Sequence, residues 1–130
     1  MMSTTFLEHV NVTVSDPAAT ARRLKDWFGW EVRWKGASLG GGTTYHIGND
    51  TSYIAAYSPA HSTTPVKGES YSQHGGLNHI AVVVDDLDAA EARIKESGYV
   101  TRNHGDYEPG RRFYFDDDDG IEFEVVAYEY

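Results

Sequence analysis

The stretch Leu-Glu-His-Val-Asn-Val-Thr-Val-Ser-Asp at residues 7–16 returns, with few changes, as Leu-Asn-His-Ile-Ala-Val-Val-Val-Asp-Asp at residues 77–86. The two copies align without a gap, so His9 falls on His79. Self-similarity of this kind indicates that one supersecondary unit has been built twice. The repeat therefore predicts two equivalent strands that carry a histidine at the same point.

Within both copies, β-branched residues alternate with residues of other kinds, which is typical of a strand with two different faces. In the first copy Val10, Val12 and Val14 share one face, and His9 lies on the other. His79 is placed in the same way in the second copy. We expect a helix to cover the β-branched face, which leaves each histidine on the opposite face.

Each repeated strand leads into a predicted helix. Asp16 followed by Pro17 is typical of a helix start, and this helix should run to about residue 28. The second helix should begin after Asp86 and run to about residue 97. A glycine, Gly29 or Gly98, follows each predicted helix and is expected to end it.

Three more strands are predicted in each half, at residues 30–35, 43–47 and 52–57 and at residues 99–103, 112–115 and 121–128. Residues 102–111 contain Gly105, Pro109 and Gly110, and we expect a mobile loop there.

The expected fold is α+β, a single domain over residues 1–130 built from two tandem strand-helix-strand-strand-strand modules. The first module covers about residues 5–58 and the second about residues 77–130. Residues 59–76, rich in Ser, Thr, Pro and Gly, form the expected linker. The modules should make a curved mixed sheet around a concave metal cleft, with the helices on its outer face.

Composition excludes several classes of function. The chain of 130 residues has 11 basic and 20 acidic residues, a formal net charge of -9 that argues against nucleic acid and anionic membranes as partners. The absence of cysteine excludes disulfides and thiolate metal sites. No secretory signal and no apolar run near the roughly 20 residues of a membrane span are seen, so a cytoplasmic location is expected.

The doubled module with a histidine early in each first strand resembles the vicinal oxygen chelate superfamily, which includes glyoxalase I, extradiol dioxygenases and bleomycin-resistance proteins. A third similarity is an acidic turn, a glycine and a glutamate four residues later, which is Asp117-Asp118-Asp119-Gly120-Ile121-Glu122-Phe123-Glu124 here. The resemblance places Glu124 at the family's metal-ligand position.

Alternation along the last strand puts Glu124 on the same face as the two histidines. Two imidazoles and a carboxylate suit a divalent first-row metal with open coordination positions. His9, His79 and Glu124 are therefore the expected ligands of Fe, Mn, Ni or Zn, and Glu124 is also an expected catalytic residue. The simpler alternative is that both histidines only fill the mouth of a barrel.

The remaining candidates are less constrained. Aligning residues 55–57 with residues 126–128 puts Tyr53 opposite Glu124, where glyoxalase I-like enzymes carry an acidic residue. Tyrosine is a poor neutral ligand and a weak base, which favours an extradiol-like set of three ligands. His104 and Tyr114 nearly trace the extradiol pattern and would be acid-base groups, or else an exposed loop residue and a hairpin aromatic residue.

The resemblance implies a metal-dependent enzyme with a small substrate that offers two vicinal oxygens. It would be either a glyoxalase-like lyase or isomerase or an extradiol-type dioxygenase. The alternative is a metal-free protein that sequesters a small molecule, as bleomycin-resistance proteins do. Family members pair the modules within one chain or between two chains, so a homodimer is expected by analogy.

Overall fold

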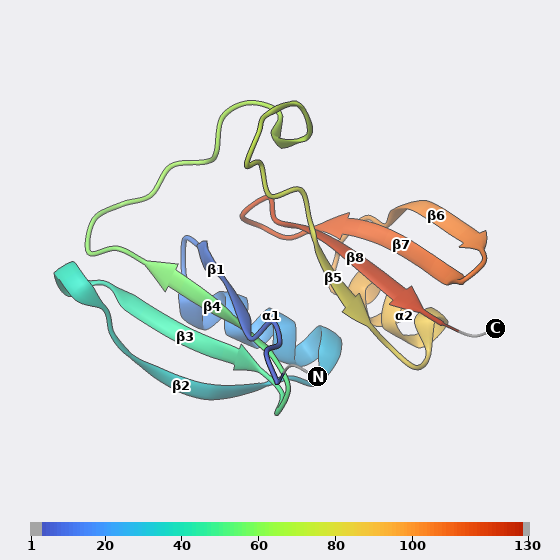
Figure 1. Cartoon of the computed structure of the whole chain (residues 1–130), viewed down its shortest axis with the longest axis horizontal. Coiled ribbons are helices and arrows are strands. Elements are labelled where there is room, and N and C mark those ends of the chain that lie inside the picture. The colour runs from blue at the N-terminus through green and yellow to red at the C-terminus, as the bar shows by residue number, and fades with distance from the viewer. Residues whose placement is uncertain (1–3, 129–130) are drawn as a thin grey trace. The chain divides into compact units, whose positions relative to one another are not determined.

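The computed structural model describes residues 4–128, and these residues form two helices and eight strands. The chain divides into two compact units, Met1–Thr64 (unit 1) and Pro65–Tyr130 (unit 2). Both units have the same order of elements, strand, helix and three strands, as Figure 1 shows. The prediction of an α+β fold made from two tandem modules is confirmed. Among the described residues no helix is both long and apolar enough to cross a membrane.

Unit 1 is a four-stranded mixed sheet with the strand order β1-β4-β3-β2. β1 pairs with β4 in parallel, and the other pairs are antiparallel. The helix α1 contacts β2, β3 and β4 and so covers one face of this sheet (Figure 1). The elements are β1 (His9–Thr13), α1 (Pro17–Phe28), β2 (Glu31–Ala37), β3 (Thr43–Gly48) and β4 (Tyr53–Ser58).

Unit 2 repeats this plan with the strand order β5-β8-β7-β6 and a parallel pair of β5 with β8. The helix α2 contacts β8. The elements are β5 (Ile80–Val83), α2 (Leu87–Glu96), β6 (Arg102–Tyr107), β7 (Gly110–Asp116) and β8 (Glu122–Ala127). A single turn of 3-10 helix, η2 (Ser70–Ser72), precedes β5.

The helix boundaries follow the predicted signals. The Asp16 carboxylate accepts hydrogen bonds from the backbone N–H groups of Ala18 and Ala19, and Gly29 adopts φ 72° where α1 ends. The Asp86 carboxylate accepts from Ala89 N–H at the start of α2. These caps satisfy amide groups that lack partners inside the helix.

The apolar core of each unit comes from its helix and from strand positions that alternate along the chain. The buried apolar side chains include Val14, Leu24, Trp27, Ile47 and Ile54 in unit 1, and Val82, Ile94, Phe113, Phe115, Phe123 and Val125 in unit 2. The helix-covered face of each sheet is therefore the structural face, and the opposite face is left for polar residues.

The predicted mobile loop at residues 102–111 is wrong. These residues form most of a β-hairpin, in which β6 pairs with β7 around the two-residue turn Glu108-Pro109. Gly105 and Gly110 lie in the paired strands. The register shifts between Arg102 and Gly105, where Asn103 has φ 55°. A bulge and a tight turn use the same residue types as a loop, which explains the error.

The acidic turn before β8 is held together by Asp117. This residue is 7% exposed, and its Oδ1 accepts hydrogen bonds from the backbone N–H groups of Asp119 and Ile121, both at 2.9 Å. The carboxylate thus fixes the chain immediately before the strand that carries Glu122 and Glu124.

We predict that Asp117→Ala lowers the free energy of unfolding by about 1–3 kcal/mol, because two amide groups at a mostly buried turn lose their acceptor. Urea unfolding followed by circular dichroism measures the loss. The matched control is Asp85→Ala, at an exposed aspartate. Equal effects of the two substitutions would contradict this account of the turn.

Candidate functional site

On the face of unit 2 away from the core, a histidine and a glutamate come together. β5 runs parallel to β8 with Ala81 opposite Glu124, so His79, two residues before Ala81, shares the face of Glu124. The Nε2 atom of His79 lies 3.1 Å from Oε1 of Glu124. Two of the three predicted metal ligands therefore lie side by side within one unit.

Glu124 is a nearly buried carboxylate with a cationic neighbour, Arg112. Glu124 is 8% exposed, and its Oε2 accepts a hydrogen bond of 3.0 Å from Nη1 of Arg112 on β7. The Arg112 guanidinium also lies over the ring of Tyr107, 4.9 Å from its centroid. Removing a carboxylate from water is costly unless positive charge and donors replace the water, and here the Arg112 guanidinium does so at Oε2.

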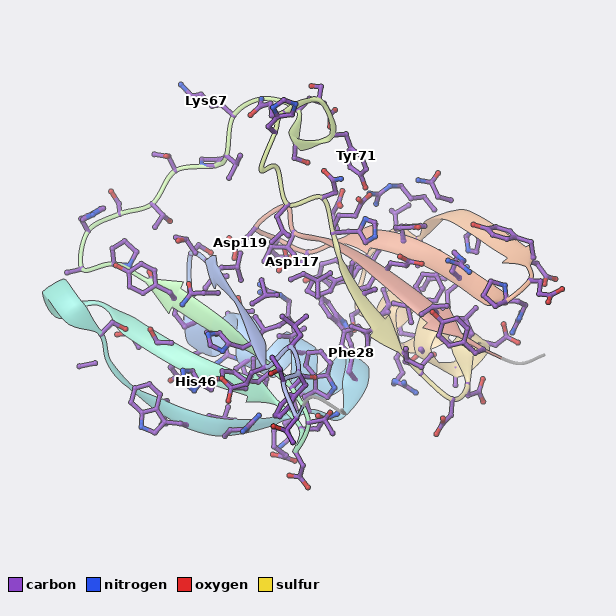
Figure 2. The ribbon with its side chains drawn as sticks, in the orientation of Figure 1. Phe28, His46, Lys67, Tyr71, Asp117 and Asp119 are labelled. Carbon is purple, nitrogen blue, oxygen red and sulfur yellow. The ribbon has the colours of Figure 1, made fainter. Side chains whose placement is uncertain are left out.

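The linker supplies a residue that sequence reasoning missed. Tyr71, in η2, extends from the linker toward the strands of unit 2 (Figure 2). Its hydroxyl donates to Oε1 of Glu122 and lies 3.2 Å from Nδ1 of His79. The hydrogen bond to Glu122, together with burial, raises the pKa of Tyr71 to about 12, so the phenol keeps its proton at neutral pH. No local pattern marks this residue, because its hydrogen-bond acceptor Glu122 lies 51 residues further along the chain.

Glu122 is itself held by a guanidinium. Arg102, on β6, donates from Nη2 to Oε2 of Glu122 and, over 3.1 Å, to Oδ1 of Asp116. Glu122 Oε1 lies 3.7 Å from Nδ1 of His79. The two glutamates of β8 therefore flank the same imidazole, and each is paired with an arginine, Glu124 with Arg112 of the adjacent β7 and Glu122 with Arg102 of β6.

Tyr114 contacts the imidazole edge-on. Its ring centroid lies 5.5 Å from that of His79 with an interplanar angle of 83°, and it is the register partner of Glu124 on β7. Burial raises the pKa of Tyr114, and the charge of Glu124 adds to this effect. The phenol is therefore protonated at neutral pH and can act as a hydrogen-bond donor rather than as a base.

His104 is not brought to this cluster. It lies on β6 with its Nε2 2.6 Å from Oε2 of Glu91 on α2, and its ring lies 6.1 Å from that of the buried Phe113. Burial works to raise the pKa of Glu91, but hydrogen bonds from Thr101 and His104 outweigh it and lower that pKa. The structure thus ties His104 to the helix, on the side of the sheet opposite Glu124.

The remaining candidates, His9 and Tyr53, lie together in unit 1. The Nδ1 atom of His9 is 2.9 Å from Oε1 of Glu8, and the Tyr53 hydroxyl donates to the same oxygen over 3.0 Å. The rings of His9 and Tyr53 are stacked at 4.8 Å, and Tyr53 also stacks on His46, labelled in Figure 2, at 4.5 Å. Hydrogen bonds from His9 and Tyr53 lower the pKa of Glu8, so this carboxylate is ionised at neutral pH.

Strand register corrects one expectation about Tyr53. Val10 pairs with Ile54 in unit 1 as Ile80 pairs with Phe123 in unit 2. The counterpart of Tyr53 is therefore Glu122, two residues before the predicted match. Because β-strand faces repeat every two residues, Tyr53 keeps the predicted face but not the predicted position.

The true counterpart of Glu124 in unit 1 is Ala55. His46 pairs with Ala55 as Tyr114 pairs with Glu124, so the antiparallel register gives the same result as the parallel one. A methyl side chain cannot bind a metal. The fourth ligand position of glyoxalase I-like sites therefore has no ligand side chain in this protein.

The donor set of unit 2 fits part of a metal site. Two ligand atoms about 2.1 Å from one metal ion and at right angles are about 3.0 Å apart, close to the observed spacing of His79 Nε2 and Glu124 Oε1. Both His9 and His79 are held at Nδ1, as ligating histidines usually are. Residues 4–128 contain no ready-made cluster of three or more His, Asp or Glu able to hold a metal ion.

Comparison with known proteins identifies the fold. No curated protein sequence matches the chain. Among solved structures, a glyoxylase/bleomycin resistance protein/dioxygenase domain from Frankia sp. EAN1pec is 21% identical, with a TM-score of 0.80 over 98% of this chain and 100% of that chain. TnmS3, an antibiotic binding protein from Streptomyces sp. CB03234, is 18% identical, with a TM-score of 0.73 over 99% and 100%.

A third similar structure is the fosfomycin resistance protein FosX from Listeria monocytogenes, complexed with Mn(II) and sulfate, which is 20% identical with a TM-score of 0.69 over 97% and 93%. These structures share the fold. The family model of the Glyoxalase/Bleomycin resistance protein/Dioxygenase superfamily matches residues 6–125, nearly the whole chain. The chain therefore belongs to the glyoxalase/bleomycin resistance protein/dioxygenase superfamily.

Proposed function

We propose that this protein is a metal-dependent enzyme that acts on a small substrate with two vicinal oxygens, and that His9, His79 and Glu124 bind the metal. The observation that carries the proposal is the 3.1 Å spacing of His79 Nε2 and Glu124 Oε1 on the face of unit 2 away from its core. His9 is the third ligand because it occupies the position of His79 in the repeated module.

A divalent ion bound by these three side chains would act as a Lewis acid toward the substrate oxygens. Fe, Mn, Ni and Zn all accept this donor set, and the Mn(II) complex of FosX supports a divalent metal in this superfamily. Arg112 holds one oxygen of Glu124 and leaves Oε1 directed at His79. The Tyr114 phenol can donate a hydrogen bond to a substrate oxygen beside this pair.

Within the superfamily, the set of ligands favours extradiol-type chemistry over glyoxalase I-type chemistry. Glyoxalase I-like enzymes need an acidic side chain at the fourth position, and Ala55 occupies that position here. Tyr53 lies two residues before Ala55 on β4. Burial and the Glu8 carboxylate raise the pKa of Tyr53, so it is not a base at neutral pH. We therefore propose an extradiol-type dioxygenase as the first activity to test.

One observation favours a second candidate, a metal-free binding protein. Glu124 already has a cationic partner in Arg112, so its burial does not require a metal ion. TnmS3, which has the same fold, is described as an antibiotic binding protein. In this case the same face would bind a small molecule without changing it.

We predict that protein purified without chelators from a metal-supplemented culture holds close to one equivalent of a first-row transition metal per site. His79→Ala should lose most of this metal, because one of three ligands is removed, whereas His61→Ala, in the exposed linker, should retain it. Inductively coupled plasma mass spectrometry measures both. A metal-free wild-type protein would contradict the proposal and support the binding protein.

We propose that the protein is a homodimer. Metal analysis of mixed variants shows whether one chain or two chains build each site. His9→Ala and His79→Ala proteins are unfolded, mixed and refolded together. In a dimer whose sites combine His9 of one chain with His79 of the other, half of the sites in each mixed dimer have all three ligands, and metal binding returns. In a site built within one chain, no mixed dimer regains the metal.

The reaction class has its own test. Protein reconstituted anaerobically with Fe(II) should consume dioxygen when catechols are added, because three protein ligands leave positions for both reactants. An oxygen electrode follows the reaction, and Glu124→Gln is the inactive control. Turnover of a hemithioacetal together with no oxygen uptake would contradict the dioxygenase assignment while leaving the metal site intact.

A further inference from the structure

The linker places one hydroxyl group between Glu122 and His79. Tyr71 is fixed there by its own short turn, in which the Glu69 carboxylate accepts a hydrogen bond from Tyr71 N–H at 3.3 Å and the Glu69 carbonyl accepts from Ser72 N–H at 3.3 Å. The Tyr71 hydroxyl contacts Oε1 of Glu122 and Nδ1 of His79. A linker residue is thereby connected to the imidazole of the candidate metal site.

The direction of these hydrogen bonds follows from counting protons. A phenol has one proton to donate, and an ionised carboxylate can only accept. Glu122, which also pairs with the Arg102 guanidinium, receives the proton of Tyr71. Toward His79 the hydroxyl oxygen can then only accept, so the Nδ1 atom of His79 must be the donor.

We propose that Tyr71 is a positioning residue that keeps a proton on Nδ1 of His79, so that the Nε2 lone pair faces Glu124 and is ready to bind a cation. This inference rests on the proposed function, since it assigns His79 as a ligand through Nε2. It adds a residue outside both repeated strands to the site. It also gives the linker a role beyond joining the two modules.

In the first module a tyrosine and a glutamate also lie beside Nδ1 of the histidine, with their roles exchanged, and this supports the inference. There Nδ1 of His9 contacts the Glu8 carboxylate, and the Tyr53 hydroxyl donates to that same carboxylate. Tyr53 occupies the strand position of Glu122. In both modules a hydrogen-bonded tyrosine–glutamate pair contacts Nδ1 through one of its members, which is the glutamate in the first module and the tyrosine in the second.

The test compares Tyr71→Phe with the wild-type protein by calorimetric titration of the metal-free proteins with Mn(II). We expect the Kd to rise on the order of 10–100-fold, as when outer-shell partners of ligating histidines are removed. The matched control is Tyr99→Phe, which removes a tyrosine hydroxyl that donates to Asp118 over 2.6 Å elsewhere in unit 2. Its affinity should be unchanged. Equal affinity of Tyr71→Phe and wild type would overturn the inference.

A long-range proton–nitrogen NMR correlation spectrum of the metal-free protein at mildly alkaline pH tests the proton's position directly. In the wild type we expect a proton on Nδ1 of His79. In Glu122→Gln the share of the Nε2-protonated form should rise, because an amide can donate as well as accept and frees the Tyr71 proton to point at His79. A bare Nδ1 in the wild type, or an unchanged spectrum in Glu122→Gln, contradicts the inference.

The two readouts separate this inference from the proposed function. If the wild-type protein binds no metal, the proposed function fails, and the NMR spectrum still decides whether Tyr71 fixes the proton of His79. If the wild type binds metal and Tyr71→Phe binds it equally well, only the role of Tyr71 fails.

Discussion

The buried carboxylate of Glu124 is the constraint around which unit 2 is arranged. A carboxylate on a residue that is only 8% exposed needs a neighbour that replaces its water, and the sheet supplies the Arg112 guanidinium on one oxygen, while the other oxygen lies beside the His79 imidazole. Glu124 lies on β8, Arg112 on β7 and His79 immediately before β5, so the strand order β5-β8-β7 and its register must both be correct for this arrangement to form. The same arrangement leaves one carboxylate oxygen beside one imidazole nitrogen, which is the spacing that two ligands of one metal ion have.

Duplication followed by divergence explains why the two modules look alike and carry different chemistry. At equivalent strand positions, unit 1 has Tyr53 and Ala55 where unit 2 has Glu122 and Glu124. Backbone pairing fixes these positions, while the side chains that occupy them differ between the two modules. One module therefore presents a stack of aromatic rings, and the other presents charged groups.

Much of this could be predicted from the sequence, because alternation and caps act locally. The faces of His79 and Glu124 follow from a period of two, and both helix starts follow from an aspartate cap. Tyr71 could not be predicted, since its partner Glu122 lies 51 residues away along the chain, and Arg112 was missed because its place beside Glu124 depends on the exact register of the predicted hairpin. The match of Tyr53 was wrong by two residues because strand register is decided by pairing across the sheet, which a sequence repeat shows only approximately.

The most direct test of the account is anomalous X-ray diffraction from crystals of the Mn(II)-loaded protein, recorded to locate the metal. We predict one anomalous peak per site, about 2.0–2.2 Å from Nε2 of His79, from an oxygen of Glu124 and from Nε2 of His9. A peak bound elsewhere, or crystals in which His9 lies far from His79 and Glu124 in every pairing of modules, would contradict it.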